Sequence, residues 1–586
     1  MIFGKHINRY YLKYAGWFLL GLAALLAVDY CQMVIPKLYR MVINGMNTGF
    51  AEAGVPFTMD ILLDRVCMPL LVVILTMVVG RFLWRVCFFG AAIRVEKHLR
   101  DRMFDRAKDL SREFYQVNKV GDLMSLFTND LDTVQECVGW GIMMLCDALL
   151  LGTMAVYNMW QMDKLLTVLA LIPMGLLMAA STVLGKHMTK KWDTRQAAFS
   201  RLSDFSQESF SGIAVIKAFV KEAKELMAFK KLNVENEEAN IDFTRTSVLM
   251  RILVTFFVET VICVILGYGG WLVYNGKFDA GMLIEFLSYF STVVWPIMAV
   301  AELIDMTSRG AASLKRVSEL LDAEVTVCDR PGVRPLPNIK GTIEFRDLTF
   351  RYPGAEYDAL KNVSFTIEAG ENVGLVGKTG AGKTTLVDLI LRTYNVPDGT
   401  ILIDGRDVNA VPIRDVRAGC AYVPQDNFLF SDTIANNIAF ASDHSDHGSV
   451  VRAAVLADVD GNISEFTEGY ETVLGERGVT VSGGQKQRIS IARALMKEAP
   501  ILILDDSVSA VDTRTETAIL KNLRSTRAGK TTILIAHRIS TIEKMDKILF
   551  LDDGHISGIG THDSLYEKNP AYRKMVDLQK LEEEGA

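Results

Sequence analysis

Long apolar runs fill the first half of the chain, and several are long enough for the roughly 20 residues that a membrane-spanning helix needs. The pattern predicts six spans within residues 1–326, at 14–35, 66–89, 139–160, 165–184, 248–274 and 282–304. A cleaved signal peptide is the alternative for the first run, because Lys5, Arg9 and Lys13 precede it. No small-residue cleavage site supports that alternative, so the first run is interpreted as a span.

Two long polar segments separate the second span from the third and the fourth from the fifth. Apolar residues in the first segment recur at helical spacing, so the spans are predicted to continue as helices. Lysine and arginine are concentrated in both segments, which places them and both termini in the cytoplasm. Gly121 and Gly212 interrupt the helical pattern, so short coupling helices that dock on a soluble domain are predicted near 114–132 and 206–225.

The second half of the chain alternates short apolar strands with helices, the pattern of a soluble α/β domain. This domain is predicted at residues 341–586. Residues 327–340 contain three prolines and no helical periodicity, so they are predicted to form a linker. The predicted fold class is a membrane all-α domain of six helices with cytoplasmic extensions, followed by an α/β nucleotide-binding domain.

Composition narrows the function in two ways. Half of the residues are apolar, which fits a bilayer partner, and the net charge of −6 argues against a nucleic-acid partner. The eight cysteines form no C-x-x-C pair. They are interpreted as small apolar residues in a reducing compartment rather than as disulfides or metal ligands.

The segment GKTGAGKT, residues 377–384, matches the phosphate-binding P-loop pattern between an apolar strand and a helix. Its glycines let the backbone approach phosphates, Lys383 reaches the β and γ phosphates, and the Thr384 hydroxyl binds Mg²⁺. ATP and Mg²⁺ are therefore the predicted cofactors. The predicted nucleotide-binding residues here are Gly377, Lys378, Thr379, Gly380, Ala381, Gly382, Lys383, Thr384 and Thr385.

Two later motifs extend this site. Asp505 ends an apolar strand and is the predicted second Mg²⁺-side residue. The segment VSGGQ opens a helix and predicts a second phosphate site, formed by Ser482, Gly483, Gly484 and Gln485. One nucleotide needs only one such cradle, so two chains are predicted to face each other, each closing on the ATP of its partner.

With these motifs the whole chain resembles half-transporters of the ATP-binding cassette (ABC) exporter family. The resemblance implies that Tyr352 stacks on adenine, that Gln425 binds Mg²⁺ and senses the γ-phosphate, and that His537 contacts the γ-phosphate. It further implies that Glu476-Arg477 touches the opposite stalk, and that the segment 509–512 connects the two ATP sites.

One residue departs from the family pattern. The family's general base is a glutamate after the Mg²⁺ aspartate, and here that position is Asp506. Its carboxylate ends about 1.5 Å short, and a misplacement of about 1 Å can cost on the order of 10²-fold in rate. The chain therefore resembles the degenerate-site subunit of a heterodimeric bacterial multidrug exporter, which binds ATP, hydrolyses it poorly, and completes the partner's competent site.

The predicted function is ATP-driven export of lipophilic or drug-like small molecules across the cytoplasmic membrane by alternating access. The alternatives are an ATP-gated or sensory membrane protein and a homodimeric exporter with slow aspartate-based hydrolysis. Ionisable groups inside a bilayer usually face a partner or a cavity. Asp147 and Glu259, near mid-span, are therefore predicted to face a cavity, which favours cationic substrates.

Overall fold

The structure is a computed structural model that describes residues 3–52, 55–442, 446–475, 478, 481–509 and 511–585. The chain divides into two compact units. The helical unit comprises Met1–Lys108 and Gly121–Ala323, and the α/β unit comprises Asp109–Val120 and Glu324–Ala586. The short segment 109–120 therefore packs with the α/β unit, although it lies between two parts of the helical unit in the sequence.

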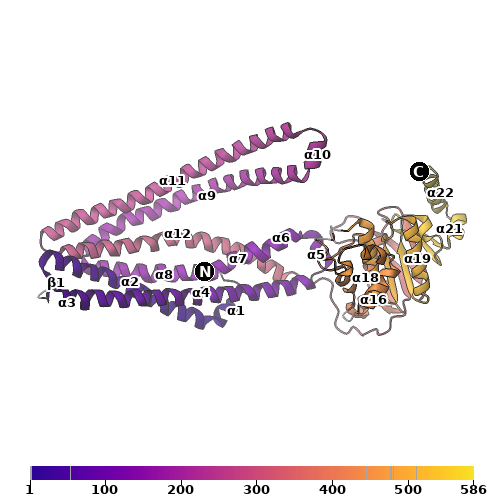
Figure 1. The fold of residues 1–586 in the computed structure, drawn as a ribbon, viewed down its shortest axis with the longest axis horizontal. Coiled ribbons are helices and arrows are strands. Elements are labelled where there is room, and N and C mark those ends of the chain that lie inside the picture. Colours follow the sequence, from indigo (N-terminus) through magenta and orange to yellow (C-terminus); the bar gives the residue numbers. More distant parts are fainter. Residues whose placement is uncertain are drawn as a thin grey trace. The chain divides into compact units, whose positions relative to one another are not determined.

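The helical unit is built from long helices joined by short elements. Figure 1 shows α9 and α11 side by side, connected by α10 at one end. The helices are α1 (Asn8–Lys13), α2 (Ala15–Thr48), α3 (Met59–Leu62), α4 (Met68–Asp109), α6 (Val120–Ser125), α7 (Leu131–Glu136), α8 (Ile142–Met162), α9 (Lys164–Ser211), α10 (Ile213–Ala218), α11 (Glu222–Tyr274) and α12 (Ala280–Asp322). Three π-helical turns, η1 (Leu63–Cys67), η2 (Leu126–Asp130) and η3 (Cys137–Gly141), and a small hairpin, β1 (Phe50–Glu52) and β2 (Val55–Pro56), complete the unit.

Within the described residues, five helical stretches are long and apolar enough to cross a membrane. They are Ala15–Thr48, Met59–Asp109, Val120–Met162, Glu222–Tyr274 and Ala280–Asp322. A shorter apolar helix, Lys164–Leu177, begins α9 at the fourth predicted span. The predicted continuation of the spans as helices is confirmed by α4, α9 and α11, which run 42, 48 and 53 residues.

Side-chain caps and buried apolar residues explain where these helices begin and how they pack. Asp163 and Asp279 cap α9 and α12 by accepting hydrogen bonds from backbone N–H groups in the first turns. Apolar side chains from α8, α9, α11 and α12 form one buried cluster, in which Met159, Leu166 and Phe286 are fully buried. The apolar faces of these four helices therefore pack together in one common core.

The α/β unit contains two sheets. The larger has the strand order β12-β11-β5-β10-β9-β8, in which only β12 runs antiparallel to its neighbour. Its strands are β5 (Asn372–Gly377), β8 (Cys420–Val423), β9 (Ile501–Asp505), β10 (Thr531–Ile535), β11 (Lys547–Asp552) and β12 (His555–Gly560). The smaller antiparallel sheet has the order β4-β3-β6-β7, formed by β3 (Ile343–Phe350), β4 (Leu360–Ile367), β6 (Ile401–Ile403) and β7 (Arg406–Asp407).

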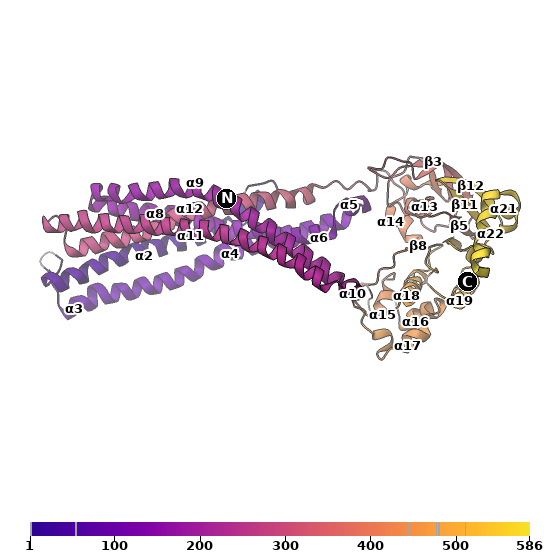
Figure 2. The ribbon, with the colours of Figure 1, turned by 90° about the horizontal axis from the view of Figure 1, so that it is seen from above.

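The helices of this unit fall into groups. Figure 2 shows α15 to α18 gathered together, away from β3 and β12. Their bounds are α15 (Ile434–Ala439), α16 (His447–Leu456), α17 (Asp460–Ser464) and α18 (Gly483–Met496). The other helices are α5 (Arg112–Val117), α13 (Lys383–Ile390), α14 (Ile413–Ala418), α19 (Thr513–Thr526), α20 (Ile539–Ile542), α21 (His562–Lys568) and α22 (Pro570–Gly585), with short 3₁₀ turns η4 (Val408–Ala410) and η5 (Gly469–Glu471).

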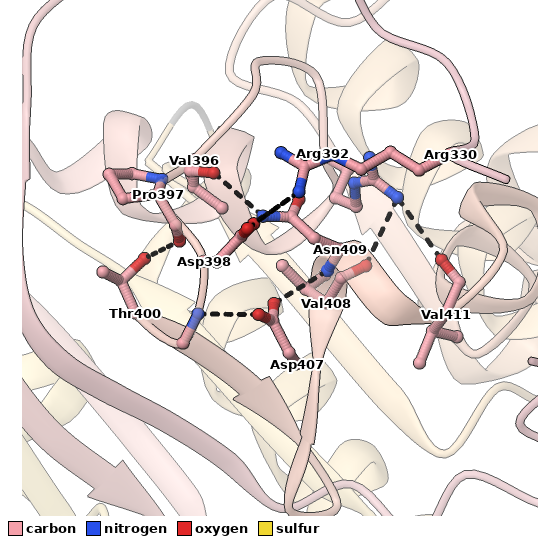
Figure 3. A network of polar contacts seen from close by, with 11 residues as sticks. Arg330, Arg392, Val396, Pro397, Asp398, Thr400, Asp407, Val408, Asn409 and Val411 are labelled. Carbon is pink, nitrogen blue, oxygen red and sulfur yellow. Dashed lines mark hydrogen bonds and ion pairs between the residues drawn. The ribbon is translucent and has the colours of Figure 1, made fainter. Parts of the chain in front are cut away.

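The predicted linker has no helix or strand and is fastened to the α/β unit by charged side chains. Arg330 donates to both carboxylate oxygens of Asp398, at 2.7 and 2.9 Å (Figure 3). Asn409 joins the same group by donating to Asp398 at 2.8 Å. Beside it, the buried Arg392 donates to the carbonyls of Val408 and Val411, so a polar network anchors the chain where it enters this unit.

Candidate nucleotide site

The P-loop lies between β5 and α13, and its glycines have no substitute there. A Cβ atom at Gly377 would lie 2.2 Å from the carbonyl oxygen of Leu551. Gly382 has φ +98°, and a Cβ atom there would lie 2.8 Å from the carbonyl oxygen of Ala359. Both the backbone conformation and the close packing therefore require glycine. The result is an open turn whose N–H groups precede the first turn of α13, the arrangement that binds phosphate.

Lys383 is the cation of this turn. Its side chain is buried and donates to the carbonyls of Gly377 and Lys378 at 2.8 and 3.0 Å. Burial lowers the pKa of the Lys383 ammonium, while the nearby carboxylates of Asp505 and Asp506 oppose that effect. The lysine is thus held against the loop that would cradle phosphates, with acidic groups beside it.

The remaining predicted catalytic residues follow neighbouring parallel strands. Strands β5, β10, β9 and β8 are adjacent, so their carboxyl ends meet at one edge of the sheet. Asp505 is the last residue of β9, His537 follows β10, and Gln425 follows β8. The fold therefore brings these three side chains to the edge that also carries the P-loop, where open α/β sheets bind ligands.

Asp505 suits a magnesium ion. It is 1% exposed, and its Oδ2 atom has no hydrogen-bond partner among the described residues. Burial raises the pKa of its carboxyl, and the Thr384 hydroxyl is hydrogen-bonded to it. A buried, partly unsatisfied carboxylate next to a hydroxyl and a phosphate cradle matches the hard oxygen ligands that Mg²⁺ prefers. Asp505 and Thr384 would hold the ion, while Gln425 is exposed at the edge.

The backbone of Asp506 makes three hydrogen bonds. Its φ is +46°, a left-handed conformation that aspartate adopts more readily than most residues. Its N–H donates to Ile535, and its carbonyl accepts from Gln487 and Ser509 at 3.2 and 2.9 Å. Its Oδ2 atom lies 4.0 Å from Nε2 of His537. Hydrogen bonds therefore fix the backbone of this turn, so the reach of the carboxylate depends on the length of the side chain.

Tyr352 lies two residues beyond β3, beside the P-loop helix. Its hydroxyl is 2.9 Å from the Thr385 hydroxyl at the start of α13. Its ring packs edge-on against Phe350 and Tyr394, with centroids 5.1 Å apart in both pairs. Its ring is therefore held beside the phosphate loop, and its stacking on adenine stays a prediction.

The VSGGQ segment begins α18 and forms a capping box. The Ser482 hydroxyl accepts from the Gln485 N–H at 3.3 Å, and the Gln485 side chain accepts from the Ser482 N–H at 3.0 Å. Ser482 and Gly483 are exposed. Among the described residues, no hydrogen bond joins this helix start to the P-loop. This helix start is therefore separate from the P-loop of the same chain, and the predicted phosphate contacts of Ser482, Gly483, Gly484 and Gln485 stay a prediction.

Some predicted residues lie outside this description. Glu476 and Arg477, predicted to contact the opposite stalk, are outside the described residues, as is Ala510 in the segment predicted to connect two ATP sites. Asp512, at the end of that segment, caps α19 by accepting from the Thr515 N–H.

One functional contact was missed by sequence reasoning. Arg112 of α5 forms an ion pair of 2.5 Å with Asp388 of α13, the P-loop helix. Burial raises the pKa of the Asp388 carboxyl, and Arg112 opposes that rise. The two residues are 276 positions apart, so no local pattern joins them. A basic residue just before the predicted coupling helix was the available signal.

The site and the fold together define an ATP-dependent membrane protein with a fused nucleotide-binding domain. Residues 18–297 match the family described as "ABC transporter transmembrane region", and residues 360–509 match "ABC transporter". The chain is 37% identical over its full length to a Bacillus subtilis protein titled "Probable multidrug resistance ABC transporter ATP-binding/permease protein YheI", of which it covers 98%. It is 35% identical to the Escherichia coli "Multidrug resistance-like ATP-binding protein MdlA", with 98% of this chain and 96% of that protein covered.

A solved structure agrees with these relatives. The structure titled "Structure of a bacterial Atm1-family ABC exporter with ATP bound" is similar with a TM-score of 0.75 and 27% identity, covering 98% of both chains. The chain belongs to the ABC exporter family, with transmembrane and ATP-binding domains in one polypeptide. It is a multi-pass membrane protein whose ATPase domain uses ATP with Mg²⁺, and exporters of this family function as dimers in a lipid bilayer. The predicted fold class is confirmed.

Proposed function

We propose that this chain is one subunit of a heterodimeric exporter that moves lipophilic or drug-like small molecules out across the cytoplasmic membrane by alternating access. Its own ATP site binds nucleotide but hydrolyses it poorly. One observation carries the proposal: Asp506 has the place of the general base, yet its carboxylate is one carbon–carbon bond shorter than a glutamate's.

The surroundings of Asp506 give this shortening its weight. The turn after β9 is clamped by hydrogen bonds from Gln487 and Ser509 and to Ile535, so the backbone does not shift easily to compensate. Proton transfer needs a distance of roughly 2.6–3.2 Å between the carboxylate oxygen and the attacking water oxygen. A carboxylate that ends about 1.5 Å short lies beyond that distance. The ATP-binding groups Lys383, Thr384 and Asp505 remain in place, so binding is retained while the chemical step is slow.

The second half of the proposal concerns the partner. The exposed start of α18 presents Ser482, Gly483 and backbone N–H groups that its own P-loop does not use. An N-terminus of this kind favours anions. In the proposed heterodimer it closes on the nucleotide of the partner subunit, which supplies the catalytic glutamate. This chain then contributes to hydrolysis in the partner's site while its own site holds ATP.

The substrate class rests on two supports. Two of the similar proteins carry multidrug resistance in their titles, and another, from Syntrophus aciditrophicus, is titled "ATP-dependent lipid A-core flippase". The helical unit also exposes many large apolar side chains, including Phe82, Tyr157 and Phe256. A lipophilic substrate fits both. In this proposal both termini and the polar segments between spans lie in the cytoplasm, and the outward direction of transport rests on the chain's membership of the exporter family.

The test compares the purified chain alone with the chain assembled with a second half-transporter encoded beside it. Both samples are reconstituted in inverted vesicles, and ATPase rate and dye accumulation are measured together. Transport-coupled ATPase that arises only in the mixed complex supports the proposal. Strong ATPase and transport by the chain alone would instead establish a homodimeric exporter with a working Asp506. Nucleotide binding without transport in either sample would establish an ATP-gated protein.

A further inference from the structure

A cavity inside the helical unit brings together charged and aromatic side chains that the nucleotide site does not use. Its volume is about 440 Å³, and it is lined by residues of α2, α4, η3, α8 and α12. The polar lining includes Asp29, Gln32, Arg81, Asp147 and Trp295. All five elements belong to stretches able to cross a membrane, where ionisable side chains are costly and mark binding sites.

Asp29 is the residue that points to a ligand. It lies in the middle of α2, is 1% exposed, and its Oδ2 atom has no hydrogen-bond partner among the described residues. Leaving a carboxylate oxygen buried without a partner costs free energy that a bound group would recover. Because Asp29 lines the cavity, that group is one that occupies the cavity.

A second carboxyl lies against the first. Asp147 of α8 lies beside Asp29 in the same cavity, and it accepts from the Trp295 indole N–H at 2.9 Å. Two carboxylates at such close range repel each other, and one positive charge relieves the repulsion. Asp147 was predicted to face a cavity, and it lines this one. Glu259, predicted with it, is exposed on α11 and is not among the lining residues.

The remaining walls suit a cation with an apolar body. Trp84, Trp140 and Trp295 line the cavity, and indole faces attract cations. Arg81 and Arg85 also line it, but both are exposed, and the Arg85 guanidinium lies 5.2 Å from the Trp84 ring centre. Of the charged groups, Asp29 is therefore buried and Asp147 half-buried, while the two arginines are exposed and Arg81 interacts with Asp29 electrostatically.

We propose that this cavity binds a lipophilic organic cation, with its positive charge at Asp29 and Asp147 and its apolar groups against the tryptophans. The proposal deepens the proposed export function, because it names the chemical class of the exported molecule. Binding itself requires no ATP. It can therefore be tested separately from transport.

The probes are tetraphenylphosphonium and tetraphenylborate, which have the same shape and opposite charges. Equilibrium binding is measured to the full-length protein in uncharged nanodiscs without nucleotide. Tetraphenylphosphonium is expected to bind the wild type more tightly than tetraphenylborate. Asp29→Asn and Asp147→Asn are each expected to weaken phosphonium binding by about tenfold or more, since each removes one carboxylate from a poorly solvated site. Asp64→Asn is the matched control, because Asp64 is exposed at the start of the second span and lies outside the cavity; it should leave binding unchanged.

Two results would overturn the proposal. The first is equal phosphonium binding by wild type, Asp29→Asn and Asp147→Asn. The second is tighter binding of tetraphenylborate that Arg81→Gln abolishes, which would make the cavity an anion site. Thermal unfolding in the same nanodiscs checks that each variant is folded, and the half-buried Asp147 provides a second variant if Asp29→Asn does not fold. If either result is obtained while ATP-dependent export of neutral dyes is intact, this inference is refuted and the proposed export function stands.

Discussion

At the scale of single residues, the proposed separation of ATP binding from ATP hydrolysis rests on Asp506. The preceding Asp505 is buried with an unsatisfied oxygen and suits Mg²⁺, whereas Asp506 lies in a left-handed turn with its carboxylate 4.0 Å from His537. A difference of one methylene group changes where the carboxylate ends, and proton transfer is sensitive to that position.

Asp506→Glu is expected to raise hydrolysis at this site, because the longer side chain restores the reach of the base. The gain is bounded by about 10²-fold, and the left-handed turn reduces it, since glutamate adopts φ +46° less readily than aspartate. The measurement is single-turnover hydrolysis in the assembled complex after the partner's catalytic glutamate is replaced by glutamine. Transport should rise less than hydrolysis, because a site that retains ATP keeps the two ATP-binding domains together.

The native residue provides the control for that experiment. With the partner's glutamate replaced, the wild-type Asp506 site should show little single-turnover hydrolysis, and Asp506→Asn should lower it only slightly further. Substantial hydrolysis that depends on the native Asp506 would show that aspartate is a working base here, and the degenerate-site proposal would be wrong.

Lys383→Ala is expected to weaken nucleotide binding to this subunit while lowering turnover of the complex only partly. The Lys383 ammonium is the buried cation of the P-loop, and in the proposed heterodimer it serves the slow site. Equilibrium binding of a fluorescent ATP analogue to this subunit, alongside ATPase of the complex, checks both parts. Complete loss of transport with nucleotide binding unchanged would contradict the assignment of this lysine.

At the scale of elements, the start of α18 has two roles that substitutions can separate. Ser482 caps the helix, and it is also the residue proposed to meet the partner's γ-phosphate. Aspartate is as good an N-cap as serine, so Ser482→Asp should change the free energy of unfolding by less than about 0.5 kcal/mol. Its negative charge repels phosphate, so ATPase of the complex should nevertheless fall steeply.

Gln485→Ala is the matched control for that variant. It removes the reciprocal bond of the capping box and leaves the Ser482 hydroxyl in place. It should destabilise α18 modestly and reduce turnover far less than Ser482→Asp does. If Ser482→Asp kept wild-type ATPase in the complex, the proposed contact across the two subunits would be lost.

An ion pair between Arg112 and Asp388 joins the short helix α5 to the P-loop helix. Arg112→Ala leaves Asp388 buried without its cation, and the cost is expected to be about 1–3 kcal/mol of stability in the α/β unit. Adding Asp388→Asn should recover most of that loss, because a neutral amide is buried at lower cost than an unpaired carboxylate. Thermal unfolding of the single variant and of the double variant measures the loss of stability and its recovery. The control is Arg106→Ala, which removes a basic residue from the last turn of α4.

At the scale of the whole molecule, the proposal pairs the exposed start of α18 with the P-loop of a second subunit. The P-loop of this chain is likewise paired with the start of the corresponding helix in that subunit. In the proposed heterodimer, vanadate should trap nucleotide in the partner's P-loop and leave exchangeable ATP in this one, because only the partner site reaches the hydrolytic transition state. Photolabelling with azido-ATP, followed by separation of the two subunits, measures where the trapped nucleotide lies. Equal trapping on both subunits would contradict the asymmetry.

The local patterns of the sequence were sufficient for the elements and for the nucleotide motifs. The apolar runs indicated the spans and their continuation as long helices, since period and length are properties of a segment by itself. The P-loop, Asp505 and His537 could be placed on one edge because parallel neighbouring strands end together. The structure adds the left-handed φ of Asp506 and the capping box at Ser482, both at positions that the sequence motifs had already indicated.

Contacts between residues far apart in the chain required the tertiary structure. The pairing of Arg112 with Asp388 joins segments 276 residues apart, and the pairing of Asp29 with Asp147 joins two different spans. Hydropathy shows that an acid is inside a span but not which helix it faces, because that depends on how the helices rotate and pack. For the same reason Asp147 and Glu259 had equal standing in the sequence, while the fold placed only Asp147 against the cavity. The sequence alone predicted which groups bind ATP, because those motifs are local, and packing decided which acids share a cavity of the helical unit.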